Sequence, residues 1–487
     1  MYFPVEGLPE SVGEHNLLWK ERTGGKYNFG IPPTIRAGRL LMGSVRRAVE
    51  GHGNVAGNGS LICYDLHRGG RIWQMVVKSS FYGLCSAPVV RGERVYVQGG
   101  DAVCVDLMGL VDGNDGPFKG ELEYSMRRGQ ELLPDDGDIL WRYDYKAEFG
   151  ITGRHGHAGT PVVVGNQVWV PTSFGHGVEK MNQHVKRHEL NVPLDEPDPK
   201  KVPWKPNIYV FDARDGRLIA HDTVRVPEVL HGAWSSLSWA EVDGRPLVFW
   251  GDGYGVLHAF AAPEPVPGEV VELEHVWHYD CNPHEHRYDT EGNPLSFPYL
   301  PWEPEYDARE PGPSYIIGAP VFHDGKLYIA TGRDYHYDSK RGDGGPGALH
   351  CIDPRGRGDI SESGRVWMTT DVGRSANTVA VIPDGLLFIA DNRNALYCFD
   401  ADTGERYWRH ELDGHAFYCS PLVADGKVYI GSYRRDFHVL RADRELQVLS
   451  RTELDAAVVT PTCVDGLLVV PTWRSVHVFT GPGYEAP

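Results

Sequence analysis

Short runs in which apolar and polar residues alternate dominate this sequence, and turns rich in glycine and aspartate separate them. The clearest unit spans residues 420–454, where a short apolar strand and an Asp425-Gly426 turn precede three further segments, KVYIGS, FHVLRA and QVLSRTEL. Such alternation between turns indicates antiparallel strands. Repeated units of four strands are typical of the blades of a β-propeller.

The same unit recurs along the whole chain. The last three units begin 43 and 40 residues apart. The sequence therefore predicts an all-β fold in which residues 1–487 form a single eight-bladed β-propeller of four-stranded antiparallel blades. Seven blades would result if the irregular unit at 234–280 were not a complete blade. First strands are expected to begin near Pro32, Ala87, Thr160, Trp234, Gly318, Asn377, Ser420 and Thr460. Loop insertions are expected at 107–137, 174–206, 281–317 and 333–347.

The final unit predicts how the ring closes. It starts at Thr460 and ends after three strands, at VHVFT (476–480), whereas a suitable fourth strand, NLLWKE (16–21), stands near the start of the sequence. We expect these two segments to pair, because this removes two exposed sheet edges.

Two residue types repeat at fixed places in the units. Tryptophan occurs in the fourth strand, as in RIWQ (71–74), and it is expected to fill the gap between neighbouring sheets. Four of the eight cysteines share one local pattern: Cys63, Cys104, Cys351 and Cys398. Equivalent positions in different blades do not meet, so no disulfide is expected. CxxC and CxxCH motifs are absent, which argues against c-type haem and zinc ribbons.

Charge narrows the class of partner. The formal net charge is -18, with 66 acidic and 48 basic residues. Nucleic acid is therefore not an expected partner, because phosphate contacts need clustered Lys and Arg. The first residues show no basic region followed by an apolar core, and no apolar run is long enough to cross a bilayer. We expect no membrane insertion, and a cytoplasmic location unless a signal is missing from this sequence.

Several stretches carry a resemblance to a known family. Segments TPVVVGNQVWV (160–170), GAPVFHDGKLYIATG (318–332) and LYCFDADTGERYW (396–408) resemble the pyrroloquinoline-quinone (PQQ)-like propeller repeat. GLCSAPVV (83–90) and LHGAWSS (230–236) are similar to a planctomycete-type group of these proteins. The resemblance implies the propeller fold, with roles that include dehydrogenases and assembly scaffolds. For dehydrogenases of this fold, the resemblance implies a vicinal disulfide against the quinone ring and a calcium-binding Glu-Asn-Asp set. This sequence has no adjacent Cys-Cys pair and no clear set of that kind, which argues against bound PQQ.

One face of such a propeller is the expected place of function. In a four-stranded blade, the second-to-third turns and the blade-to-blade connections lie on the same face. Most of the insertions fall there, with 107–137 on the opposite face as the exception. Enlarged loops on a rigid scaffold usually carry function.

Histidines in these loops are metal-ligand candidates. Neutral imidazoles from several blades could converge on a divalent ion of Cu, Fe, Mn, Zn or Ca. The alternative is that each ring satisfies backbone groups of its own loop. The candidate ligands are His155, His157, His231 and His336.

The same loops offer catalytic and substrate-binding candidates. His231, Arg374 and His415 are the candidate catalytic residues, and arginines could clamp a carboxylate or sulfate. Aromatic residues could stack on a sugar or quinone ring. The alternative is that the arginines are ordinary exposed residues and the aromatic residues pack the loops. The substrate-binding candidates are Tyr82, Trp234, Tyr418, Arg434, Arg435 and Trp473.

Three functions fit these features. The leading one is an oxidoreductase-like enzyme with a His- and Arg-lined site at the channel mouth, acting on a small molecule or carbohydrate. A metal-assisted carbohydrate lyase or epimerase uses the same residues. The third is a non-catalytic scaffold that binds a protein partner through loops 174–206 and 281–317.

Overall fold

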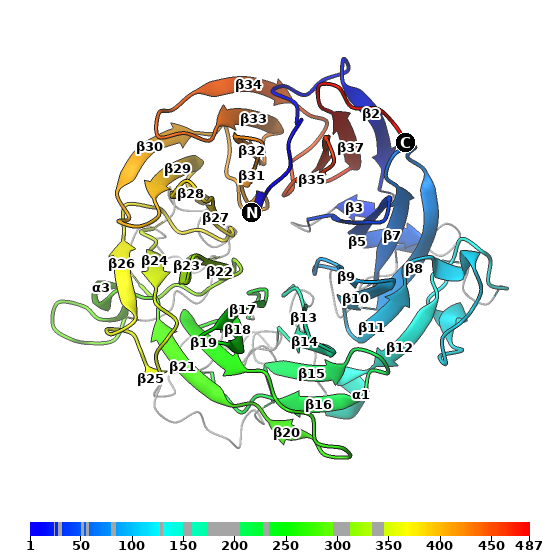
Figure 1. Ribbon diagram of the computed structural model, residues 1–487, viewed down its shortest axis with the longest axis horizontal. Coiled ribbons are helices and arrows are strands. Elements are labelled where there is room, and N and C mark those ends of the chain that lie inside the picture. The colour runs from blue at the N-terminus through cyan, green and yellow to red at the C-terminus, as the bar shows by residue number, and fades with distance from the viewer. Residues whose placement is uncertain are drawn as a thin grey trace.

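A computed structural model shows eight small, mainly antiparallel sheets arranged as a ring around a common axis (Figure 1). It confirms the eight-bladed propeller, and the seven-blade alternative is wrong because the unit at 234–280 forms a complete sheet. The residues described are 1–23, 25–27, 32–49, 53–54, 58–78, 84–126, 130–149, 158–173, 205–226, 233–295, 312–333 and 345–487.

Each blade is built on four strands, which are given below in order from its inner edge outwards. The blades are numbered in chain order. Blades 1 and 2 consist of β4 (Thr34–Arg36), β5 (Arg39–Val49), β7 (Asn58–Asp65) and β8 (Arg71–Lys78), then β9 (Val89–Arg91), β10 (Arg94–Gln98), β11 (Ala102–Asp106) and β12 (Ile139–Tyr143). Blades 3 and 4 consist of β13 (Val162–Val164), β14 (Gln167–Pro171), β15 (Ile208–Asp212) and β16 (Leu218–His221), then β17 (Ser238–Val242), β18 (Arg245–Gly251), β19 (Val256–Ala261) and β21 (His275–Asp280).

The second half of the ring repeats this order. Blades 5 and 6 consist of β22 (Val321–His323), β23 (Lys326–Ala330), β24 (Leu349–Ile352) and β26 (Arg365–Thr369), then β27 (Ala380–Val381), β28 (Leu386–Ala390), β29 (Ala395–Asp400) and β30 (Arg406–Glu411). Blades 7 and 8 consist of β31 (Leu422–Ala424), β32 (Lys427–Gly431), β33 (Asp436–Arg441) and β34 (Val448–Glu453), then β35 (Thr462–Val464), β36 (Leu467–Pro471), β37 (Ser475–Thr480) and β2 (Leu17–Arg22).

Helix is almost absent from the described residues. The short helical segments are η1 (Gly109–Val111), η2 (Glu121–Glu123), α1 (Tyr145–Phe149) and α3 (His284–Arg287). Within the ranges given above, no helix has the length and apolar character needed to span a membrane.

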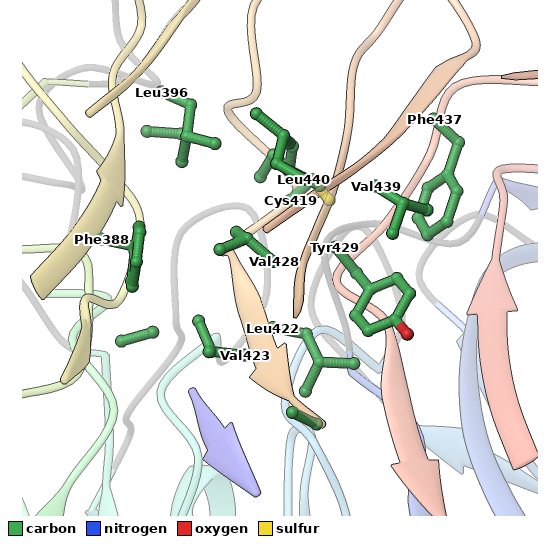
Figure 2. Close-up of a cluster of buried hydrophobic side chains, with 14 of the residues drawn as sticks. Phe388, Leu396, Cys419, Leu422, Val423, Val428, Tyr429, Phe437, Val439 and Leu440 are labelled. Carbon is green, nitrogen blue, oxygen red and sulfur yellow. The ribbon is translucent and has the colours of Figure 1, made fainter. Parts of the chain in front are cut away.

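The burial of the strands explains the sequence pattern. Every residue of β32 is buried, because a middle strand packs against a neighbouring sheet on each side, whereas the outer strand β34 contains no buried residue. Middle strands can therefore be apolar on both faces, and polar residues gather in the outermost strand. Figure 2 shows part of the resulting core, in which side chains of blades 6 and 7 form one buried cluster.

The ring closes as the sequence predicts. Strand β2 pairs antiparallel with β37, so the start of the sequence supplies the outer strand of blade 8. One pairing was not predicted. Strand β1 (Tyr2–Phe3) pairs in parallel with β31, at the inner edge of blade 7 near the centre of the ring (Figure 1).

Tryptophans of the outer strands join each of six blades to the next. Each indole N–H donates to a backbone carbonyl in the third-to-fourth turn of the following blade, at 2.8–3.2 Å. The glycine of that turn often covers the indole: Gly404 has a φ of +74°, and a Cβ there would lie 2.7 Å from Trp367. The pairs are Trp19–Leu66, Trp73–Leu107, Trp141–Ala213, Trp277–Pro354, Trp367–Ala401 and Trp408–Asp443.

The repeated cysteines lie directly opposite four of these tryptophans. Cys63 pairs across the strands with Trp73, and Cys398 pairs with Trp408 in the same way. None of the eight cysteines, all of which lie in the described ranges, forms a disulfide in the structure. Burial raises the pKa of Cys63 to about 12, so its thiol stays protonated and unreactive.

Third-to-fourth turns also protect outer edges. The turn of blade 4 places β20 (Val271–Glu272) parallel to β16 of blade 3, and the turn of blade 5 places β25 (Gly358–Asp359) parallel to β21 of blade 4. The 107–137 insertion does the same for blade 1, where Asp136 bridges Gln74 in parallel. An edge covered in this way is not open to pairing with another chain.

Candidate functional site

The blade-to-blade connections and the second-to-third turns meet on one face, as predicted. In four successive blades a backbone N–H of the turn donates to a carbonyl of the connection that enters that blade. The donor and acceptor pairs are Gly332–Tyr315, Asn392–Arg374, Tyr433–His415 and Trp473–Ala457. Arg374 and His415 therefore occupy equivalent positions in neighbouring connections. Their side chains belong to two different groups of residues.

The first group, here called the aromatic cluster, consists of His415, Tyr418, Tyr433 and Trp473. The His415 ring stacks on Tyr433, with centroids 4.6 Å apart and planes 20° apart. Trp473 meets both tyrosines edge to face, at 5.5 Å from Tyr418 and 5.2 Å from Tyr433. Three of these four residues were singled out from the sequence, and the structure brings them together.

Local hydrogen bonds fix the turns that carry this cluster. The Ser432 hydroxyl accepts the backbone N–H of Arg434, and the Thr472 hydroxyl accepts that of Ser475. Hydroxyl side chains commonly stabilise turns in this way. Gly414 leaves room for the Arg434 side chain, because a Cβ at residue 414 would lie 2.9 Å from its Cγ.

The aromatic cluster has a buried layer and an exposed layer. His415 and Tyr418 are only 4% and 8% exposed, whereas Tyr433 is 43% exposed. Arg434 and Arg435 beside Tyr433 are also exposed, and Arg435 forms an ion pair of 2.5 Å with Glu453. The surface at this place therefore combines an aromatic ring with cationic side chains.

The second group, here called the buried basic cluster, consists of His286, Arg333 and Arg374. Their exposed fractions are 2%, 3% and 0%. The interpretation of Arg374 as an ordinary exposed arginine is therefore wrong. Burial, followed by the charges of Arg374 and Arg333, lowers the pKa of His286 to about 4, so its ring is neutral at pH 7.

Five predicted site residues lie outside the described residues: Tyr82, His155, His157, His231 and His336. Within the described ranges no group of three or more His, Cys, Asp or Glu residues could hold a metal ion. The metal site therefore stays a prediction. Trp234 is half-buried in the connection that enters blade 4, next to the undescribed residues 227–232.

Three members of the two clusters were not predicted from the sequence as site residues. Tyr433 directly precedes the two predicted arginines, so its position in the turn was an available signal. Arg333 begins the histidine-containing RDYHYD turn, and His286 lies in the HEHR segment that forms α3. Neither local sequence indicates that both side chains are buried beside Arg374.

Comparison with known proteins agrees with this architecture. The family profile described as outer membrane protein assembly factor BamB matches residues 14–262 and 345–458. The chain belongs to this PQQ-like repeat family. The crystal structure of BamB from Moraxella catarrhalis is similar at 14% sequence identity and a TM-score of 0.55, covering 95% of this chain and 99% of that one.

Two further comparisons give no additional information on function. The crystal structure of the computationally designed Ika8 protein is similar at 11% identity and a TM-score of 0.49, over 96% of this chain and 99% of that one. Among curated proteins no sequence matches. The solved structures therefore bear on the fold alone, and the function has to be argued from the site.

Proposed function

We propose that this protein is a non-catalytic binding propeller that engages a protein partner through the aromatic cluster and the adjacent arginines. One observation carries the proposal. Tyr433, Arg434 and Arg435 are exposed on the loop-bearing face, whereas the candidate catalytic residues His415 and Arg374 are buried.

Burial weighs against acid–base catalysis by these two residues. A general acid or base must come within hydrogen-bond reach of the group it protonates or deprotonates. The His415 ring lies under Tyr433 and is 4% exposed, and Arg374 is fully buried. An oxidoreductase or a lyase would need reactive groups from other parts of the face.

The exposed layer suits recognition of a protein. Tyrosine, tryptophan and arginine dominate the energetically important residues of protein interfaces. Here Tyr433 is held in place by stacking on His415 and by the edge of Trp473, so little side-chain freedom is lost on binding. The family name, an assembly factor, also supports a protein partner.

Site-specific crosslinking in the source cells tests this proposal. A photoreactive amino acid at residue 433 is expected to give one discrete adduct with a second protein. The matched control is the same amino acid at Leu446, which is 44% exposed and lies in the third-to-fourth turn of the same blade, on the opposite face. Trp473→Ala should weaken the adduct at residue 433, because it removes the ring that supports Tyr433.

The outcome separates the possible functions. No adduct at residue 433, or the same adducts at 433 and 446, would contradict a partner site on this face. Turnover of a substrate that persists in the His415→Ala and Tyr433→Ala variants would instead support an enzyme with its site elsewhere on the propeller.

A further inference from the structure

The buried basic cluster is assembled by one asparagine. Asn392, in the second-to-third turn of blade 6, donates its backbone N–H to the carbonyl of Arg374 at 2.8 Å. Its side-chain Nδ2 donates to the carbonyl of Arg333 at 2.9 Å. The two arginines come from different parts of the chain, the turn of blade 5 and the connection between blades 5 and 6. Asn392 therefore holds their backbones at one place.

A second set of bonds holds the α3 segment at the same place. Asn282, just before α3, donates from Nδ2 to the carbonyl of Ser314 at 2.9 Å and accepts the Ser314 backbone N–H at 2.7 Å. Arg333 Nε donates to the neighbouring carbonyl of Pro313 at 3.0 Å. Hence the insertion that carries His286 and the turn that carries Arg333 are anchored to adjacent residues, Ser314 and Pro313.

Two buried donors in this cluster lack an acceptor among the described residues. There, the Nη2 of Arg333 and the Nδ1 of His286 have no hydrogen-bond partner, although both residues are at most 3% exposed. Within the described part of the chain, no carboxylate lies in ion-pair distance of Arg333. Burying a guanidinium without a counter-charge costs free energy, so an anion is expected to occupy the space beside it.

We propose that the buried basic cluster binds one oxyanion group, a carboxylate, sulfate or phosphate, between blades 5 and 6. The planar fork of Arg333 matches two oxygens of such a group, and charge-assisted hydrogen bonds of this type are strong. The neutral His286 ring donates through Nδ1–H, which adds a directed bond without another full charge. Arg374 belongs to the same cluster, where its backbone carbonyl accepts the N–H of Asn392.

The oxyanion has two possible sources with the same chemistry. It is a free inorganic ion that stabilises the fold, or it is the acidic group of a larger small molecule. Titration with sulfate, phosphate and a dicarboxylate, each at equal ionic strength in a chloride buffer, distinguishes them. Preference for an inorganic ion indicates the first source, and preference for the dicarboxylate indicates the second.

Isothermal titration calorimetry on the purified full chain provides the test. We expect one anion to bind per chain, and we expect Arg333→Met to weaken its affinity at least about tenfold. The control is Arg441→Met, which changes an exposed arginine that bonds Gln447 at the far end of blade 7 and should leave binding unchanged. In parallel, NMR titration should show a rise in the pKa of His286 when the anion is bound, because an adjacent negative charge favours the imidazolium.

A second variant distinguishes the loss of the binding group from misfolding. Arg333→Lys keeps the charge but removes the fork, so it should fold and still bind the anion more weakly than the wild type. Absence of binding for all three anions, or equal affinity in Arg333→Lys and Arg441→Met, overturns the proposal. Because these residues lie in blades 4 to 6, failure here leaves the crosslinking result at residue 433 in blade 7 unaffected.

Discussion

Replacing Trp73 with alanine tests whether the six indole hydrogen bonds between neighbouring blades, here called the tryptophan joints, stabilise the ring. Trp73 is completely buried in blade 1, and its indole N–H donates to the carbonyl of Leu107 in blade 2 at 2.9 Å. Gly109 lies against the ring so closely that a Cβ there would be 2.7 Å from Trp73. The change would therefore remove a large side chain from a space that no neighbour can easily refill.

The expected cost follows from these contacts. Truncation of a buried tryptophan to alanine typically destabilises a protein by about 3–5 kcal/mol. Trp73→Phe keeps most of the aromatic contact but leaves the Leu107 carbonyl without its donor, which costs about 1–3 kcal/mol. The control is Trp239→Ala, because Trp239 is 45% exposed and its loss should change the free energy of unfolding by about 0.5 kcal/mol or less.

Urea denaturation followed by circular dichroism measures these differences as shifts in the midpoint at constant slope. The order of stability should be wild type, Trp239→Ala, Trp73→Phe and then Trp73→Ala. If Trp73→Ala were no less stable than Trp239→Ala, the joints would not contribute to stability as argued. If Trp73→Phe matched the wild type, the hydrogen bond across the blades would contribute nothing.

Three further predictions concern closure, metal and pH. Deleting residues 1–22 removes β2 from blade 8 and should lower the urea midpoint sharply, and an unchanged midpoint would refute its role in closing the ring. If the channel mouth holds a metal, as the loop histidines predict, elemental analysis should find a divalent ion in the wild type and less in His231→Ala; equal content in both would count against His231 as a ligand. Burial lowers the pKa of His275, His286, His350 and His438 from 6.5 to about 4, so the unfolded chain binds more protons than the folded one between these values. The contribution of these histidines to stability should therefore be fully present above about pH 6.5 and should be lost as the pH drops towards 4. A urea midpoint that is higher at pH 5 than at pH 7 would contradict this.

Much of the fold could be predicted from the sequence, because each blade repeats the same local signals. Strand alternation, the aspartate–glycine turns and the outer-strand tryptophans place all eight blades to within a few residues of their first strands. Closure by β2 was predictable for the same reason, since a unit lacking its fourth strand has to find it elsewhere. Strand β1 carried no such signal, because its two residues fit a pairing only once the inner edge of blade 7 exists.

The site was less predictable. The topology of a blade places Arg374 and His415 on the correct face, but it does not determine whether a side chain on that face is exposed. Arg374 is buried among groups from three separate loops, including His286, which lies almost ninety residues earlier in the chain. Tyr433 was overlooked because a single tyrosine in a turn looks like ordinary loop packing until its stacking on His415 is seen.

The tryptophan joints also have a consequence for how such a protein can change during evolution. In six blades the third-to-fourth turn must present a carbonyl to the preceding blade, so its backbone path is fixed by a partner outside the turn. Even the long 107–137 segment keeps Leu107 in place before it diverges. The described second-to-third turns of blades 5 to 8 instead bond to the connection that enters their own blade, so they do not have to reach the outer strand of a neighbouring blade. New sequence can therefore accumulate on that face at little cost to the ring, and binding specificity can diversify there while the scaffold stays the same.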